Sequence, residues 1–212
     1  SKRRLIFPEI TENHYRKITI KGKDYYIYHT FYPFQPDINW LNPNVLYYNL
    51  ETINYWANMG VDIFRMDAIP YLSKEEGTNA ENQPITHSII KLLSAYIQAV
   101  SPRSVIQAEA CQQPKEILPY FGNERKVNIA NKEGEKEIKR TDEFQIAYHF
   151  PYMPALWATL ITKDSKYFKE IDKTTPEIPQ SAIWAVFLRV HDELTLEMID
   201  PATRELIYNS LV

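Results

Sequence analysis

Apolar residues follow a helical spacing in some segments and a strand-like run in others, and the two alternate after residue 42. Helical spacing occurs near residues 43–59, 85–100, 114–121, 153–161 and 203–211. Short apolar runs occupy residues 61–66, 105–108, 144–147 and 183–190. The alternation predicts an α/β fold with a parallel sheet, because parallel strands are joined by crossovers that are usually helices.

The first 36 residues follow a different pattern. Two short β-prone runs, 17–20 and 25–28, flank a turn that contains Gly22, which predicts a β-hairpin. We therefore expect two parts, a small β-containing part over residues 1–36 and a βα part over residues 37–212. Residues 123–140 are polar and charged, and we predict an exposed surface loop there.

Composition excludes several classes of protein. The chain has 212 residues, 44% of them hydrophobic, and a net charge of −3, so no polyanionic partner is implied. No long basic block occurs, and nucleic-acid binding is not expected. Cys111 is the single cysteine, which excludes an internal disulfide and fits a reducing compartment. No apolar run approaches about 18 residues, so we expect neither a signal peptide nor a membrane partner, and a cytoplasmic location.

Acidic residues follow three of the predicted strands. The run 61–66 carries Arg65 and is followed by Asp67, and residues i and i+2 of a strand point to the same face. The run 105–108 is followed by Glu109, and the run 183–190 by His191 and Asp192. In a parallel βα barrel these strand ends open onto one face, where active sites lie.

Simpler interpretations exist for each feature. Taken alone, Arg65 and Asp67 are typical of a structural ion pair, and a lone His191 is more often a packed core residue. Carboxylates and a histidine at barrel strand ends also suit a divalent metal ion. Arg65 would compete with such a cation for Asp67, which disfavours a metal site.

Four motifs in order resemble the α-amylase family of glycoside hydrolases. They are the segments 35–39 (QPDIN), 60–68 (GVDIFRMDA), 108–110 (AEA) and 187–194 (FLRVHDEL). Segments 76–82 and 149–154 further resemble the trehalose synthases within that family. The resemblance implies a partial TIM (β/α)8 barrel comprising about strands 4 to 7, preceded by part of a small domain inserted after strand three.

The resemblance also implies a role for each candidate residue. Asp67 matches the family's nucleophile, Glu109 its acid/base, and Asp192 the acid that steadies the transition state. Arg65 and His191 match residues that orient the nucleophile and bind sugar hydroxyls. The implied substrates are α-linked glucose disaccharides or oligosaccharides, converted through a glycosyl-enzyme intermediate.

The chemistry of the residues gives the same assignment. A retaining glycosidase needs one ionised carboxylate as nucleophile and one protonated carboxyl as acid. Arg65 favours an ionised Asp67, whereas Glu109 has apolar neighbours and no adjacent cation in sequence, which favours a raised pKa.

Several features depart from the family pattern. The Asp-x-x-x-Asn-His motif of strand three is absent, as are the first two strands and the eighth. That motif supplies a calcium ligand in many members, so we expect no cofactor here and a calcium site only in a longer form of the protein. Val190 and Cys111 stand where trehalose synthases usually have asparagine, which alters the pocket wall.

Two further expectations concern the incomplete barrel. An alternative function is a catalytically incompetent truncated barrel that at most binds sugar. Because an open parallel sheet has unpaired edges, we also expect self-association through the exposed barrel edges.

Overall fold

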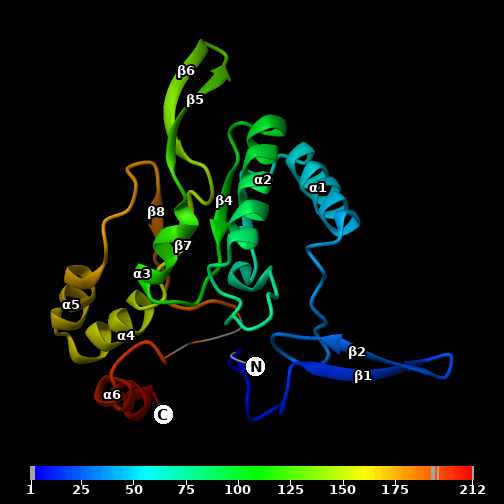
Figure 1. The fold of residues 1–212 in the computed structure, drawn as a ribbon. Helices are drawn as coiled ribbons and strands as arrows, with labels where there is room; N and C mark the ends of the chain where they lie inside the picture. Colours follow the sequence, from blue (N-terminus) through cyan, green and yellow to red (C-terminus); the bar gives the residue numbers. More distant parts are fainter. Residues whose placement is uncertain (1–2, 192–193, 195, 212) are drawn as a thin grey trace.

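A four-stranded parallel sheet forms the centre of the computed structural model, which describes residues 3–191, 194 and 196–211 (Figure 1). Its strands are β3 (Ile63–Met66), β4 (Val105–Ala108), β7 (Ile146–Tyr148) and β8 (Ile183–Ala185), paired in the order β3-β4-β7-β8. All three pairs are parallel. The predicted parallel βα arrangement is therefore confirmed in the described residues.

The register aligns the carboxyl ends of the strands. Met66 lies opposite Ala108, and Ala108 lies opposite Ala147. The residues that follow β3 and β4, Asp67 and Glu109, therefore leave the sheet at the same level. The Glu109 N–H extends the ladder by donating to the Met66 carbonyl at 3.0 Å, so the backbone of Glu109 is tied to β3.

Helices connect the strands. They are α1 (Pro43–Asn58), α2 (Pro84–Val100), α3 (Pro114–Ile117), α4 (Tyr152–Thr162), α5 (Lys166–Thr174) and α6 (Pro201–Leu211), with 3-10 turns η1 (Ile69–Tyr71) and η2 (Leu118–Phe121). Asn42 caps α1, since its side chain accepts from the Asn44 N–H at 3.0 Å, and Pro43 opens the helix. Helix α5 was missed by the sequence analysis, because its charged positions obscure the apolar spacing.

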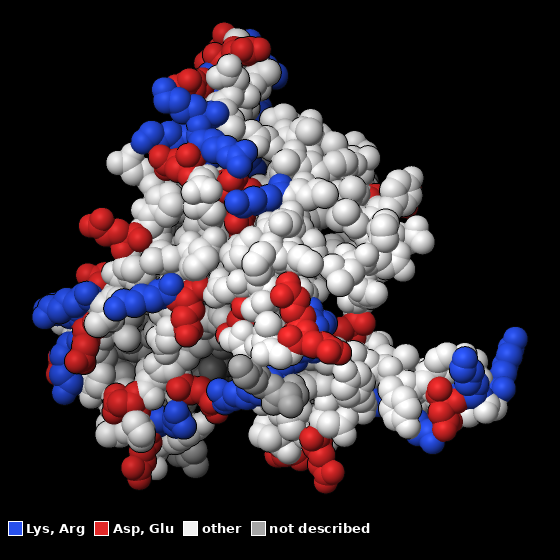
Figure 2. Space-filling view, in the orientation of Figure 1, with Lys and Arg blue, Asp and Glu red and all other residues white. Residues whose placement is uncertain are grey.

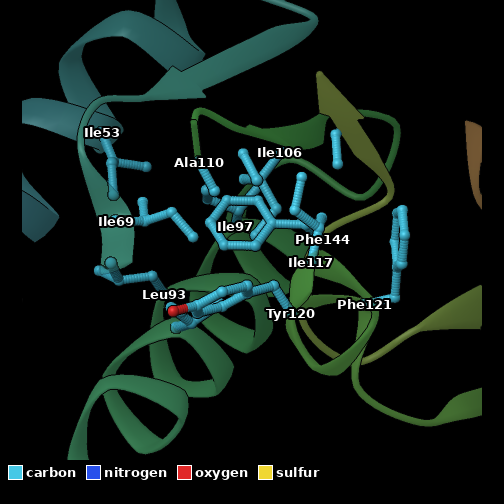
Figure 3. Close-up of a cluster of buried hydrophobic side chains, with 13 residues drawn as sticks. Ile53, Ile69, Leu93, Ile97, Ile106, Ala110, Ile117, Tyr120, Phe121 and Phe144 are labelled. Atoms are coloured by element: carbon cyan, nitrogen blue, oxygen red, sulfur yellow. The ribbon is translucent and has the colours of Figure 1, made fainter. Parts of the chain in front are cut away.

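The main core lies between α2 and the sheet (Figure 3). Ile90 and Ile97 on α2 and Ile106 on β4 have no exposed surface. Tyr120 and Phe144 pack into the same cluster from the segments between β4 and β7. Burying side chains of this size contributes about 1.5–3 kcal/mol each, so this cluster fixes β4 against α2.

Two hairpins extend from this body (Figure 1). The first, β1 (Tyr15–Ile20) and β2 (Lys23–Tyr28), confirms the hairpin predicted near the N-terminus. The second, β5 (Glu124–Asn131) and β6 (Gly134–Thr141), stands where we predicted an irregular loop, and that prediction was wrong. Cross-strand ion pairs such as Lys126–Glu137, 2.9 Å, support a ladder whose charged composition resembles that of a loop.

The last strand is shorter than predicted. The run 183–190 was expected to be one continuous strand, but β8 ends at Ala185. The final ladder bond is donated by the His149 N–H to the Ala185 carbonyl, 3.0 Å. Beyond it, Phe187 packs edge-on against Tyr148 and Phe150 at ring distances of 5.0 and 5.3 Å, and the chain leaves the sheet.

The surface is chemically uneven. Charged residues of both signs cover the β5–β6 hairpin, whereas the face over α1 is mostly uncharged (Figure 2). Tyr47, Tyr48, Tyr55 and Trp56 of α1 are all exposed there. In the described residues, β3 and β8 each pair on one side only, as expected for an open sheet. No helix in the described part of the chain is long and apolar enough to span a membrane.

Gly122 controls the entry into the β5–β6 hairpin, and its replacement should destabilise the protein. Its backbone has φ 67° and ψ −141°, and an added Cβ would lie 2.1 Å from Asp142 Oδ1. Asp142 cannot easily move, because it accepts from the Asn123 N–H at 2.7 Å. We expect Gly122→Ala to lower the free energy of unfolding by at least about 1–3 kcal/mol, the range for a strained backbone. Chemical denaturation of the full-length protein measures this.

Gly22 provides the matched control. It also has a positive φ, 77°, but an added Cβ would meet nothing within 4 Å. Gly22→Ala should therefore destabilise less than Gly122→Ala. Equal losses in the two variants would contradict the role assigned to Asp142.

Candidate active site

Strand β3 presents Arg65 and Asp67 on one face, as the sequence predicts. Arg65 Nη1 lies 3.1 Å from Asp67 Oδ1. The Asp67 side chain is 76% exposed, whereas that of Arg65 is 29% exposed. The carboxylate is thus open to a ligand at the end of the strand, while its cation is partly covered.

Glu109 reaches the same arginine from the next strand. Its Oε1 pairs with Arg65 Nη2, and its Oε2 accepts from the Ala68 N–H at 3.3 Å. Its side chain is only 14% exposed. Ala68 has φ 47°, a left-handed conformation that turns the chain sharply after Asp67 and directs this N–H to Glu109. One guanidinium therefore binds both carboxyl groups. Its contact with Glu109 was not predicted from the sequence.

The two carboxyl groups differ in acidity. Hydrogen bonding with Glu109, followed by the charge of Arg65, lowers the pKa of Asp67. Burial, followed by hydrogen bonding and charge repulsion from Asp67, raises the pKa of Glu109 to about 8. The charge of Arg65 lowers the pKa of Glu109, but this effect is smaller than the combined effect of burial and Asp67, because Arg65 is shared between two acids. The predicted directions of both shifts are confirmed.

Tyr148 is a site residue that the sequence analysis missed. It ends β7, and the guanidinium carbon of Arg65 lies 5.9 Å from the centre of its ring. Phe187 packs edge-on against the Tyr148 ring, with ring centres 5.0 Å apart. The signal was available, because Tyr148 directly follows the predicted strand 144–147, but only acidic strand ends were sought.

Of the remaining predicted residues, only His191 belongs to the described part of the chain, six residues after the end of β8. His191 is exposed, and its charge contributes to lowering the pKa of Asp67, which places it in the electrostatic neighbourhood of that acid. Asp192 lies outside the described residues. The structure thus brings together Arg65, Asp67 and Glu109, with His191 nearby, and its described part leaves the placement of Asp192 as a prediction.

Two further features of this site are Cys111 and the alternative hypothesis that the acidic side chains bind a metal ion. Cys111 is an exposed cysteine, outside any disulfide, two residues beyond Glu109. Among residues 3–191, 194 and 196–211, no group of three or more histidine, cysteine or acidic side chains could hold a metal ion. That search does not include Asp192, so the expectation that no cofactor is bound stays a prediction.

The fold and the site together define a parallel βα protein whose ionisable groups gather at the carboxyl ends of its strands. The family model described as "Alpha amylase, catalytic domain" matches residues 10–198. The chain belongs to the α-amylase family, and its four-stranded sheet is part of the predicted (β/α)8 barrel.

Curated relatives agree with this assignment. The trehalose synthase/amylase TreS of Mycobacterium tuberculosis is 37% identical over 206 residues, which is 97% of this chain and 32% of that protein. The trehalose synthase of Thermus thermophilus is 39% identical over 186 residues, covering 87% of this chain and 18% of that protein. The chain therefore spans about a third or less of the length of these relatives.

Solved structures show the same fold. The sucrose 6F-phosphate phosphorylase of Thermoanaerobacter thermosaccharolyticum superposes with a TM-score of 0.70 and 18% identity, over 92% of this chain and 37% of that one. The isomaltulose synthase of Erwinia rhapontici gives a TM-score of 0.58 and 19% identity, over 84% and 32%.

The raised pKa of Glu109 should make the stability of the protein depend on pH. Its pKa is 4.5 in an ordinary environment and about 8 in the folded protein. The contribution of protonated Glu109 is complete below pH 4.5 and is lost as the pH rises through about 8. Because Glu109→Gln stays neutral, we expect its free energy of unfolding to change less between pH 4.5 and 8 than that of the wild type. Denaturation at several pH values measures the two slopes.

Glu76→Gln is the control for this experiment. Glu76 is exposed, and its substitution should leave the wild-type slope unchanged. A Glu109→Gln slope equal to that of the wild type would show that the folded protein does not raise the pKa of Glu109.

Proposed function

We propose that the protein containing this chain is an α-glucoside-active enzyme that works by retaining, two-step glycosyl transfer. The observation that carries the proposal is one arginine shared by two carboxyl groups with opposite pKa shifts at the ends of adjacent strands. Such a pair supplies a nucleophile and a general acid side by side, and the chemistry needs no cofactor.

In the first step, Asp67 attacks the anomeric carbon of an α-linked glucose. Glu109, protonated at neutral pH, donates its proton to the glycosidic oxygen as the bond to the leaving sugar breaks. Arg65 keeps Asp67 ionised before the attack. Positive charge develops on the sugar ring, and we propose that Asp192 and His191 bind the ring hydroxyls and stabilise this charge.

In the second step, Glu109 accepts a proton from the incoming hydroxyl. That hydroxyl attacks the glycosyl-enzyme, the bond to Asp67 breaks, and a second inversion restores the original configuration. Water as acceptor gives hydrolysis. A hydroxyl of the released glucose as acceptor gives an isomeric disaccharide, so maltose would become trehalose.

The trehalose synthases among the relatives support the disaccharide reaction, with maltose, trehalose and short α-glucans as substrates. The same relatives favour an enzyme over the alternative of a barrel that only binds sugar. The proposed binding partners are therefore α-linked glucosides.

Substitutions of the two carboxyl groups should separate the two steps. Asp67→Asn should abolish turnover of maltose, because the amide is a poor nucleophile. Glu109→Gln should lower turnover by roughly 10²–10⁴-fold, the usual contribution of general acid–base catalysis. With glucosyl fluoride, whose leaving group needs no proton, Glu109→Gln should accumulate a glucosyl adduct on Asp67. Mass spectrometry of the full-length protein after proteolysis detects the adduct.

Two controls sharpen this test. Azide, an anionic acceptor that needs no general base, should restore turnover of the fluoride by Glu109→Gln and yield the azide with retained configuration. Cys111→Ser changes an exposed side chain next to the site and should leave turnover near the wild-type level. An adduct on Cys111 instead of Asp67, or unchanged turnover in Asp67→Asn, would refute the proposed roles.

A further inference from the structure

Glu81 links the loops that carry the two catalytic candidates. Its Oε2 accepts from Gln112 Nε2 at 2.9 Å, and its Oε1 accepts from the Tyr71 hydroxyl at 3.4 Å. Tyr71 lies four residues after Asp67, at the end of η1, and Gln112 lies three residues after Glu109. A single carboxylate therefore joins the segment after β3 to the segment after β4.

The loop around Glu81 is held rigidly. Ala80 and Asn82, its two neighbours, have φ values of 69° and 51°, a left-handed conformation that is unfavourable for alanine and is adopted more readily by asparagine. Contacts to the core compensate, since the Asn82 N–H donates to the Tyr120 hydroxyl at 2.9 Å and Asn82 Nδ2 donates to the Glu116 carbonyl at 3.2 Å. The surroundings thus determine the position of Glu81 rather than leaving it to a flexible loop.

The side chains that donate hydrogen bonds to the Glu81 carboxylate are all neutral. The link between the two loops therefore consists of hydrogen bonds, whose strength depends on their direction. Asn79 Nδ2 adds a third contact at 3.3 Å, and no ion pair to Glu81 occurs among the ion pairs of the described residues. Gln112 is only 6% exposed, so losing its acceptor would leave a buried amide N–H without a partner. Hydrogen bonds to a charged acceptor are stronger than those between neutral groups, which favours a fixed position for the Gln112 side chain.

Closer to the sheet, a second link joins the same loops. The Tyr71 N–H donates to the Ala68 carbonyl at 3.1 Å, and the Ala68 N–H donates to Glu109 at 3.3 Å. Tyr71 is thus connected to Glu109 through Ala68, and Gln112 is connected to Glu109 along the chain. Both paths start at Glu81.

We propose that Glu81 is a positioning residue that fixes the spacing of Asp67 and Glu109 by clamping Tyr71 to Gln112. This inference rests on the proposed function for its effect on turnover, but the clamp itself is independent of it. Without the clamp, Glu109 should move away from Asp67 and toward solvent. A displacement of about 1 Å costs up to 10²-fold in rate, because the reacting groups are no longer aligned.

The main experiment compares Glu81→Ala with Glu76→Ala in the full-length protein. Glu76 lies in the same loop but is exposed, and its side chain forms no hydrogen bond with the described part of the chain. We expect Glu81→Ala to lower kcat on maltose by about 10- to 100-fold with KM within about twofold, as for misaligned reacting groups. Glu76→Ala should keep both constants within about twofold of the wild type, as for a surface substitution. Equal kinetics in the two variants would overturn the proposal.

A pH profile separates positioning from a general loss of folded protein. The profiles are recorded over the pH range in which denaturation shows each variant to be folded, so a shifted limb reports the pKa of Glu109 and not unfolding. If Glu109 moves away from Asp67 and from its buried position, its pKa falls, so the alkaline limb of the Glu81→Ala profile should shift to lower pH. Glu81→Gln removes the charge but keeps one acceptor oxygen, and it should shift the limb less than Glu81→Ala. A limb that stays at the wild-type pH in both variants would contradict the clamp.

Two further measurements cover the remaining outcomes. If the clamp acts through Gln112, the double variant Glu81→Ala/Gln112→Ala should be no slower than Glu81→Ala, whereas additive losses would argue against a shared path.

NMR titration of the labelled carboxyl carbon of Glu109 needs no turnover. A lower midpoint in Glu81→Ala than in Glu76→Ala supports the clamp even in a protein inactive on maltose, and equal midpoints refute it. Failure of the proposed function and failure of the clamp are thereby distinguished.

Discussion

The guanidinium of Arg65 is the contact on which the site depends. It lies between Asp67 on its own strand and Glu109 on the next, so it neutralises part of the repulsion that two adjacent carboxylates would otherwise feel. Because one cation cannot fully compensate two anions, the buried acid retains its proton and the exposed one does not. The proposed division of roles between nucleophile and acid thus follows from unequal exposure around a single charge.

The rest of the fold keeps that geometry in place. The parallel register sets Asp67 and Glu109 at the same level, and the cluster of Ile90, Ile97 and Ile106 fixes β4 against α2. The left-handed turn at Ala68 supplies the backbone N–H that orients Glu109, and Tyr148 supports Arg65 from the third strand. These contacts come from segments far apart in the chain, so the site is a property of the sheet rather than of any one motif.

The sequence predicted the features that depend on local patterns. Alternating periodicity gave the βα order and the strand ends, and the i, i+2 rule placed Arg65 beside Asp67. Contacts between strands were not predictable in this way, which is why the pairing of Arg65 with Glu109 and the position of Tyr148 emerged only in the structure. The β5–β6 hairpin was missed because its ladder is stabilised by ion pairs. Strand β8 was predicted too long because Phe187, beyond Ala185, packs on aromatic rings instead of pairing with a neighbouring strand.

The strand order gives the two catalytic candidates unequal protection against local opening. In the described residues, β4 is hydrogen-bonded on both sides, whereas β3 is hydrogen-bonded only to β4. Edge strands open at a lower free energy than interior strands, so the backbone that carries Arg65 and Asp67 should fray before the backbone that carries Glu109. Such fraying would displace Asp67 and the shared cation together and leave Glu109 in place. Any segment that pairs with the free edge of β3 therefore sets the lifetime of the assembled site, even if it contributes no side chain to the chemistry.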